Sequence, residues 1–116
     1  TVRKFRKLLD SAFKKRIILF LPLKNYKVQL PKLITYLKET NFKCSINSFY
    51  TVYKDYFKNI SEGKKNATLI KDYLVSEGVT KSTIKIVNYG NSKQLIDQKD
   101  LLANKYNNRV EIEIIW

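Results

Sequence analysis

The residue types that most often carry acid–base or metal chemistry are nearly missing from this sequence. Its 116 residues include no histidine and one cysteine, Cys44. Without imidazole no ordinary side chain titrates near neutral pH, and one thiol makes neither a zinc site nor an internal disulfide. The sequence also shows no glycine-rich phosphate loop, nucleophile elbow or usefully spaced carboxylate pair. We therefore predict a protein without catalysis, metal or cofactor, in which Cys44 is a small buried side chain of a strand.

Positive charge is the strongest feature of the composition. The formal net charge is +13 and the isoelectric point is near 9.8. The excess lies early in the chain, where the basic side chains before residue 46 face only Asp10 and Glu39. Such a balance favours an anionic partner, which can be nucleic acid, acidic lipid or an anionic wall polymer.

Residues 1–15 have the pattern of a basic amphipathic helix. Their apolar side chains recur at helical spacing, at Val2, Phe5, Leu9, Ala12 and Phe13. The helix is expected either to pack its apolar stripe on its own domain or to lie on an anionic membrane. Since the chain begins at Thr1 without a methionine or a signal arrangement, we expect a mature product or an excised fragment.

Apolar periodicity predicts four strands and two further helices in the rest of the chain. The strands fall at residues 17–21, 42–50, 84–89 and 109–116, and the helices at 30–39 and 61–77. The run from Ile17 to Leu21 is continuously apolar, which favours a central strand covered on both faces. It is much shorter than the roughly 20 residues of a membrane-spanning helix.

Local signals support the other elements. Pro31 suits the first turn of a helix, and Gly78 stands where a helix C-terminus needs positive φ. In the last strand Val110, Ile112 and Ile114 share one face, which is expected to meet the core. The order predicts an α/β (α+β) two-layer sandwich, namely a β-α-β-α-β-β mixed four-stranded sheet with helices on one face, plus the N-terminal helix.

Three pieces of sequence, at residues 67–79, 88–90 and 107–112, together resemble the OmpA-like C-terminal domain family, which associates with peptidoglycan. The stretch ATLIKDYLVSEGV at residues 67–79 is similar to the family's RAxxVxxYLxxxGI helix. The family's GYG-like turn matches residues 88–90, and its terminal NRRVEI signature matches residues 107–112. We therefore assign residues 1–15 to a leading helix and residues 16–116 to an OmpA-like domain.

The resemblance implies that the domain grips peptidoglycan stem peptides by their diaminopimelate group, with one Asp and one Arg. Carried over by position, the Asp site falls on Thr51, the Arg site on Asn66 and a loop Asn on Asn59, while Arg109 lies in the terminal signature. Both charged anchors are thus replaced, which predicts weak or altered wall binding. Substitutes are possible, since Asp55 can take the acidic role and Lys64 or Lys65 the basic one. Arg109 can equally pair with a carboxylate or carbonyl beside the last strand.

By the same resemblance we expect a non-catalytic, periplasmic module of an inner- or outer-membrane-associated protein. It would bind peptidoglycan, or serve as a scaffold that contacts other envelope proteins in a secretion or motility complex. The alternative is a basic nucleic-acid-binding α/β module, although no RNA-binding signature is present. The aromatic residues between Phe49 and Phe57 fit either class if they stack on sugars or bases, and neither if they fold back over the sheet edge.

Overall fold

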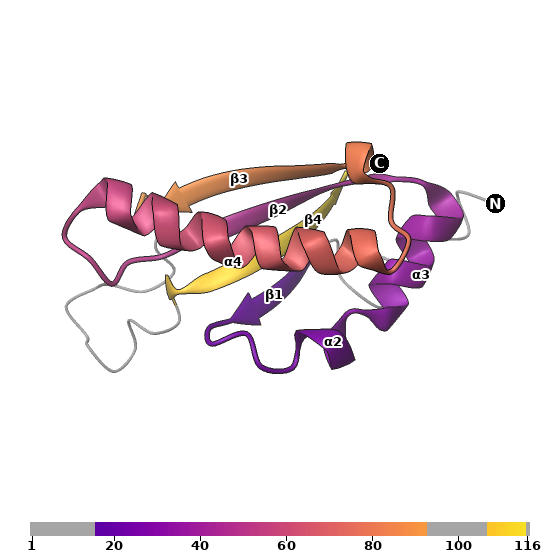
Figure 1. Cartoon of the computed structure of the whole chain (residues 1–116), viewed down its shortest axis with the longest axis horizontal. Helices are drawn as coiled ribbons and strands as arrows, with labels where there is room; N and C mark the ends of the chain where they lie inside the picture. Colours follow the sequence, from indigo (N-terminus) through magenta and orange to yellow (C-terminus); the bar gives the residue numbers. More distant parts are fainter. Residues whose placement is uncertain (1–15, 93–106, 116) are drawn as a thin grey trace.

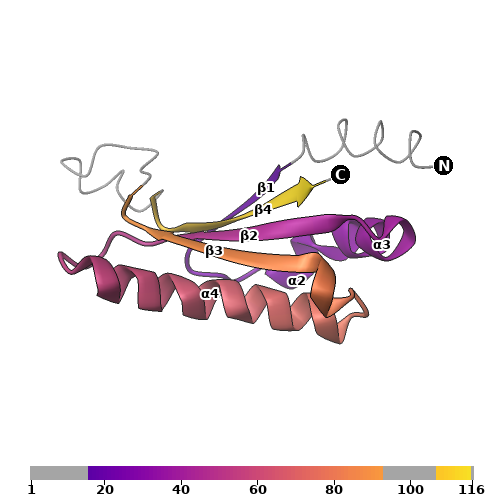
Figure 2. The ribbon, with the colours of Figure 1, turned by 90° about the horizontal axis from the view of Figure 1, so that it is seen from above.

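The computed structural model describes residues 16–92 and 107–115. The elements are β1 (Arg16–Phe20), α2 (Tyr26–Gln29), α3 (Pro31–Thr40), β2 (Lys43–Phe49), α4 (Tyr56–Ser76), the 3₁₀ turn η1 (Lys81–Thr83), β3 (Ile84–Gly90) and β4 (Arg109–Ile115). The four strands form one sheet in the order β1-β4-β2-β3 (Figure 1). Seen from above, α4 runs along one face of the sheet, α2 lies on the same side, and α3 lies at one end of the sheet (Figure 2). The predicted mixed sheet with helices on one face is confirmed, whereas the predicted helix over residues 1–15 lies outside the described residues.

The core lies between the sheet and the helices, and the strand and helix periodicities supply it as predicted. It contains Leu33 and Leu37 of α3, Cys44 and Ile46 of β2, Ala67, Ile70 and Leu74 of α4, Ile84 of β3, and Val110, Ile112 and Ile114 of β4. The core side chains of the strands share one face of the sheet, and the core side chains of α3 and α4 pack against them. Burial of this apolar surface is the main force that holds the helices on the sheet.

The helix ends follow their local sequence signals. Pro31 occupies the first turn of α3, and Gly78 follows α4 with φ of 101°. One end was predicted wrongly, because α4 begins at Tyr56 rather than at Ser61. The cause is Asp55, whose carboxylate accepts hydrogen bonds from the backbone N–H groups of Phe57 (2.8 Å) and Lys58 (3.4 Å) and so caps an earlier start.

The prediction of a central first strand is wrong, because β1 lies at one edge of the described sheet. It pairs antiparallel with β4, and β4 separates it from β2. Leu19 faces the helices and is 3% exposed, whereas Ile18 and Phe20 on the other face are 40% and 45% exposed. An apolar run predicts a strand but not its place in the sheet, and here the last strand takes the central place.

Helix α4 packs tightly against β2 at Gly63. A Cβ atom on Gly63 would stand 2.7 Å from Ser48 Oγ and 3.2 Å from Ser48 Cβ. Ser48 is fully buried and its hydroxyl donates to Asn88 Oδ1 of β3 at 2.6 Å, so it cannot easily move away. The glycine therefore sets the distance between the helix and the sheet.

We predict that Gly63→Ala lowers the free energy of unfolding by about 1–3 kcal/mol, because the methyl group pushes α4 off β2. This is opposite to the usual effect of replacing a helical glycine by alanine. Urea unfolding measures the change, with the exposed neighbour Lys64→Ala as a control expected to stay within about 0.5 kcal/mol. A Gly63→Ala protein as stable as the control would show that the helix does not lie this close.

A second prediction concerns Cys44, whose burial raises the pKa of its thiol from 9.0 to about 11. Above pH 9 the unfolded chain loses this proton before the folded one does, so the folded state is progressively destabilised as the pH rises. Between pH 8 and pH 10 this thiol should remove about 1.4 kcal/mol of stability. Urea unfolding of wild type and Cys44→Ala at both pH values tests this; parallel profiles would contradict it.

Candidate functional site

The loop that follows β2 forms one wall of a cavity of about 440 Å³ beside α4. The segment after β1 and the residue before β4 complete its lining, so four separate parts of the chain meet there. The lining residues are Leu21, Pro22, Leu23, Tyr50, Val52, Glu62, Asn66, Leu69 and Asn108. Of the four residues predicted to bind a ligand, Asn66 is in this lining.

Thr51 lies behind the cavity wall and holds the loop to the sheet. Its backbone N–H and its hydroxyl both donate to Asn108 Oδ1, at 2.8 and 3.2 Å. The side chain is buried, while Asn108 itself lines the cavity. Thr51 thus positions a lining residue in this structure, although the sequence predicted it as a ligand contact.

Asn59 has a comparable supporting position. The side chain is fully buried, its Oδ1 accepts from the N–H of Tyr53 (3.0 Å), and its Nδ2 donates to the carbonyl of Tyr53 (2.9 Å). One amide from the second turn of α4 therefore fixes both backbone groups of a loop residue. This explains how an irregular loop after β2 keeps one shape.

The polar groups that remain available in the cavity are mostly amides. Asn66 is half-buried and makes no side-chain hydrogen bond to any residue in the described part of the chain. Lys65 does not line the cavity but pairs with Glu62 at 2.9 Å, which raises the pKa of the Lys65 ammonium through the hydrogen bond and the opposite charge. Burial, with smaller effects of Tyr53 and Glu62, raises the pKa of Tyr50.

The cavity wall consequently carries one carboxylate and no guanidinium or ammonium among its lining residues. Asp55, the other acidic candidate, instead caps α4. Glu62 was not predicted, although it stands one helical turn before Asn66, a spacing that places two side chains on the same side of a helix. Asn108 was not predicted as a cavity residue either, because within the terminal signature only its neighbour Arg109 was predicted to contact a ligand.

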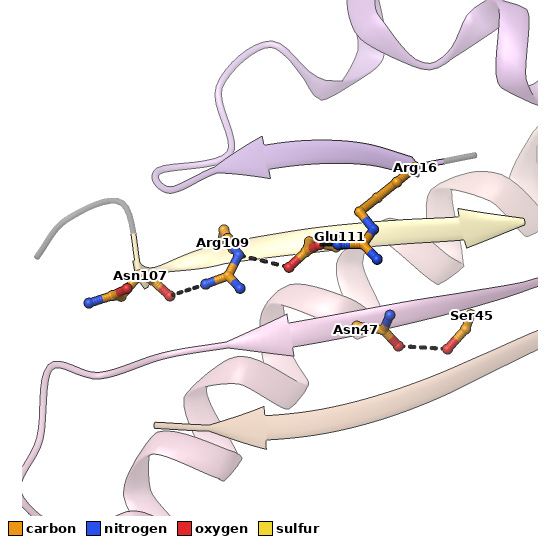
Figure 3. Close-up of polar contacts among 6 residues, drawn as sticks. All are labelled: Arg16, Ser45, Asn47, Asn107, Arg109 and Glu111. Atoms are coloured by element: carbon orange, nitrogen blue, oxygen red, sulfur yellow. Dashed lines mark hydrogen bonds and ion pairs between the residues drawn. The ribbon is translucent and has the colours of Figure 1, made fainter. Parts of the chain in front are cut away.

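Arg109 lies on the opposite face of the sheet from the cavity and the helices. Its Nε donates to Glu111 Oε2 at 2.8 Å and its Nη1 to the carbonyl of Asn107 at 3.3 Å (Figure 3). The guanidinium carbon also lies 3.8 Å from the centre of the Phe49 ring. Arg109 is 4% exposed, so in this conformation it is held by the protein itself. The four predicted residues therefore do not form one site.

Glu111 is the shared acceptor on this second face. Its other oxygen accepts from Nη1 of Arg16 of β1 at 2.9 Å (Figure 3). Arg16 is half-exposed, whereas Glu111 and Arg109 are buried. The carboxylate thereby joins β1 to β4 across the edge of the sheet. In β2, beside β4, Ser45 donates to Asn47 Oδ1 at 2.6 Å.

Metal-binding clusters and membrane-spanning helices are both absent from the described residues. No group of three or more His, Cys, Asp or Glu side chains within residues 16–92 and 107–115 is arranged to hold a metal ion. Within the same ranges no helix combines the length and apolar character required to cross a membrane.

Among the comparisons with known proteins, only the comparison with solved structures finds similar proteins, and it concerns the fold. No protein-family model matches the sequence, and no curated protein matches it. Among solved structures, the OmpA-like domain of FopA1 from Francisella tularensis superposes with a TM-score of 0.70 at 15% identity, covering 86% of this chain and 73% of that one. The peptidoglycan-associated lipoprotein of Burkholderia pseudomallei gives 0.69 at 18% identity, covering 84% and 87%. The cell wall anchor of the T6SS from Pseudomonas aeruginosa gives 0.67 at 11% identity, covering 99% and 96%.

This chain has the OmpA-like fold. The resemblance carried by residues 67–79 and 107–112 is thereby confirmed at the level of the fold, because these segments form parts of α4 and β4 in one sheet-and-helix unit. The last strand also pairs with the first, from Arg16 opposite Glu113 to Phe20 opposite Arg109.

We predict that the Arg109–Glu111 pair stabilises this OmpA-like domain much more than the Arg16–Glu111 pair does. Glu111→Gln leaves the buried Arg109 guanidinium without its carboxylate and should cost about 3 kcal/mol. Arg16→Gln removes only a half-exposed partner and should cost less than about 1 kcal/mol. Urea unfolding of both variants measures the difference. Equal losses would mean that Arg109 is not held as a buried ion pair.

Proposed function

We propose that this protein is a non-catalytic OmpA-like domain of a bacterial cell-envelope protein, which works in the periplasm and makes a weak contact with peptidoglycan through the cavity beside Asn66. The observation that carries the proposal is a cavity formed by the loop after β2 and the flank of α4, with the amide of Asn66 in its wall. The similar structures that are described as peptidoglycan-associated or as a cell wall anchor support the setting.

The chemistry of the cavity suits a peptide more than a highly charged ligand. The side-chain amides of Asn66 and Asn108 can both donate and accept, as peptide groups require. Glu62 can receive an ammonium group if it releases Lys65. A ligand carboxylate meets only neutral donors here, and these contribute roughly 0.5–1.5 kcal/mol each instead of the 1.5–3 kcal/mol typical of charged groups. The expected affinity is correspondingly low.

A scaffold role within an envelope complex is the second candidate. It is favoured by the absence of a cationic side chain from the described cavity lining, since the loss of that anchor weakens the wall contact and leaves the fold intact. In that case the domain would bind other envelope proteins. Nucleic-acid binding has in its favour the net charge of +13 and the exposed aromatic rings after β2, which could stack on bases.

We predict that Asn66→Arg increases retention on purified peptidoglycan sacculi about tenfold, because a guanidinium in the cavity adds a charge-assisted, two-pronged contact to a carboxylate. Asn66→Leu should lower retention. Co-sedimentation at several protein concentrations gives both values. Thr51→Asp is a poorer test, because the Thr51 hydroxyl lies 3.2 Å from Asn108 Oδ1 and a carboxylate there would be repelled.

Ser61→Arg is the matched control, because it adds the same charge to an exposed position on another side of α4. It accounts for non-specific attraction of this cationic chain to the wall. The peptidoglycan proposal fails if Asn66→Arg is retained no better than Ser61→Arg and Asn66→Leu no worse than wild type. Strongly salt-dependent binding to a labelled oligonucleotide without retention on sacculi would favour the nucleic-acid alternative instead.

A further inference from the structure

The loop after β2 and the first turn of α4 lie together at one end of the molecule (Figure 1), and this end exposes large apolar side chains. Four exposed side chains gather there within six residues, and we call them the aromatic tip: Val52, Tyr53, Tyr56 and Phe57. Phe57 is 78% exposed, an uncommon position for a phenylalanine. Neither the core nor the contacts described around the cavity explain why this ring faces outward.

The tip is held in shape by interactions at its base. Asp55 caps α4 directly beneath Tyr56 and Phe57, and Asn59 fixes the backbone of Tyr53. Tyr56 packs edge-on against Phe57 with the ring centres 5.6 Å apart. It also covers Gly90 of β3, where an added Cβ would lie 3.5 Å from the Tyr56 ring. The rings are therefore presented outward by a supported turn.

Positive charge surrounds these rings. Lys54 and Lys58 are exposed within the same segment, and the Lys58 ammonium lies 5.8 Å from the centre of the Tyr53 ring. The carboxylate of Asp55 is engaged with the N–H groups of Phe57 and Lys58, at the positive end of the α4 dipole. The surface thus combines apolar rings with cations, which is the chemistry that suits an anionic membrane surface.

A sugar ligand fits this surface less well. Sugar hydroxyls need several fixed hydrogen-bonding side chains beside the stacking rings. Here the amide of Asn59 is used inside the protein and one oxygen of Asp55 caps α4, which leaves mainly the hydroxyls of Tyr53 and Tyr56. The most exposed ring, Phe57, has no polar group at all. Burial of such a ring is favourable at the boundary between lipid headgroups and acyl chains.

We propose that the aromatic tip docks on an anionic lipid surface, with Phe57 entering the headgroup region while Lys54 and Lys58 approach lipid phosphates. The contact is made by the end of α4 and does not use the amides of Asn66 and Asn108. Val52 belongs both to the aromatic tip and to the cavity lining, but Lys54, Phe57 and Lys58 do not line the cavity. Variants at these three positions therefore test the lipid contact separately from the proposed peptidoglycan contact, and either can fail without the other.

The test is co-sedimentation of the full chain with vesicles of phosphatidylglycerol and phosphatidylcholine, and with vesicles of phosphatidylcholine alone. Phe57→Ser should reduce binding to the anionic vesicles about tenfold, which corresponds to about 1.4 kcal/mol. Lys54→Gln combined with Lys58→Gln should also reduce it, and the remaining binding should depend less on salt. Binding to vesicles of phosphatidylcholine alone should be weak for every variant.

Val28→Ser is the matched control, since Val28 is 80% exposed on α2 and the change leaves the net charge the same. It should bind anionic vesicles within about twofold of wild type, because only the tip is expected to enter the lipid. The proposal is overturned if Phe57→Ser and Val28→Ser bind anionic vesicles equally well. It is also overturned if Phe57→Ser loses retention on sacculi while its vesicle binding is unchanged, since the rings would then contact the wall.

Discussion

The position of β4 between β1 and β2 is the constraint on which the rest of this structure depends. The strand pairs antiparallel with both neighbours, so the backbone groups on both edges of β4 are hydrogen-bonded along most of its length. One of its faces supplies Val110, Ile112 and Ile114 to the core beneath the helices. The other face carries Arg109 and Glu111, whose ion pair is buried. A strand from the end of the sequence thus connects its beginning to its middle.

The same strand also determines where the cavity lies. Asn108 precedes β4 directly, and its amide oxygen accepts two hydrogen bonds from Thr51. The backbone carbonyl of Asn108 accepts from the N–H of Leu21, which extends the pairing of β1 with β4 by one residue. The loop after β2 and the segment after β1 are therefore both tied to one residue. The cavity between them is a consequence of how the sheet is closed, and α4 adds its outer wall.

Local patterns in the sequence predicted the four strands and the two longer helices, but neither α2 nor the start of α4. The period of two in residues 109–116 identified the side chains of β4 that meet the core, and apolar periodicity located α3 and most of α4. Sheet order was different, because it depends on which distant strand pairs with which. The apolar run at Ile17–Leu21 is compatible with a central or an edge strand, and only the pairing of β4 decides between them.

The site was less predictable than the fold for a similar reason. Of the positions carried over from the family, Asn66 lines the cavity, and it stands on a regular helix, where spacing fixes the direction of a side chain. Thr51 and Asn59 instead support the loop after β2, Thr51 from within the loop and Asn59 from α4, through hydrogen bonds that no spacing rule describes. The burial of Glu111 could not be inferred either, since its alternation with Val110 and Ile112 showed only that it lies on the face away from the core.

An asparagine, rather than a charged side chain, at residue 66 determines the electrostatic character of the cavity wall beside α4. A guanidinium at residue 66 would stand one turn from Glu62 on the same helix, where the two would attract each other. With asparagine there, Glu62 pairs with Lys65 on the outer side of α4 instead, at 2.9 Å. A ligand ammonium that approaches Glu62 must therefore compete with a lysine of the protein, while a ligand carboxylate finds no fixed positive charge in the described lining. Both effects weaken the binding of a zwitterionic ligand and leave the binding of neutral peptide groups unaffected. The cavity therefore selects ligands by shape and hydrogen bonding rather than by charge.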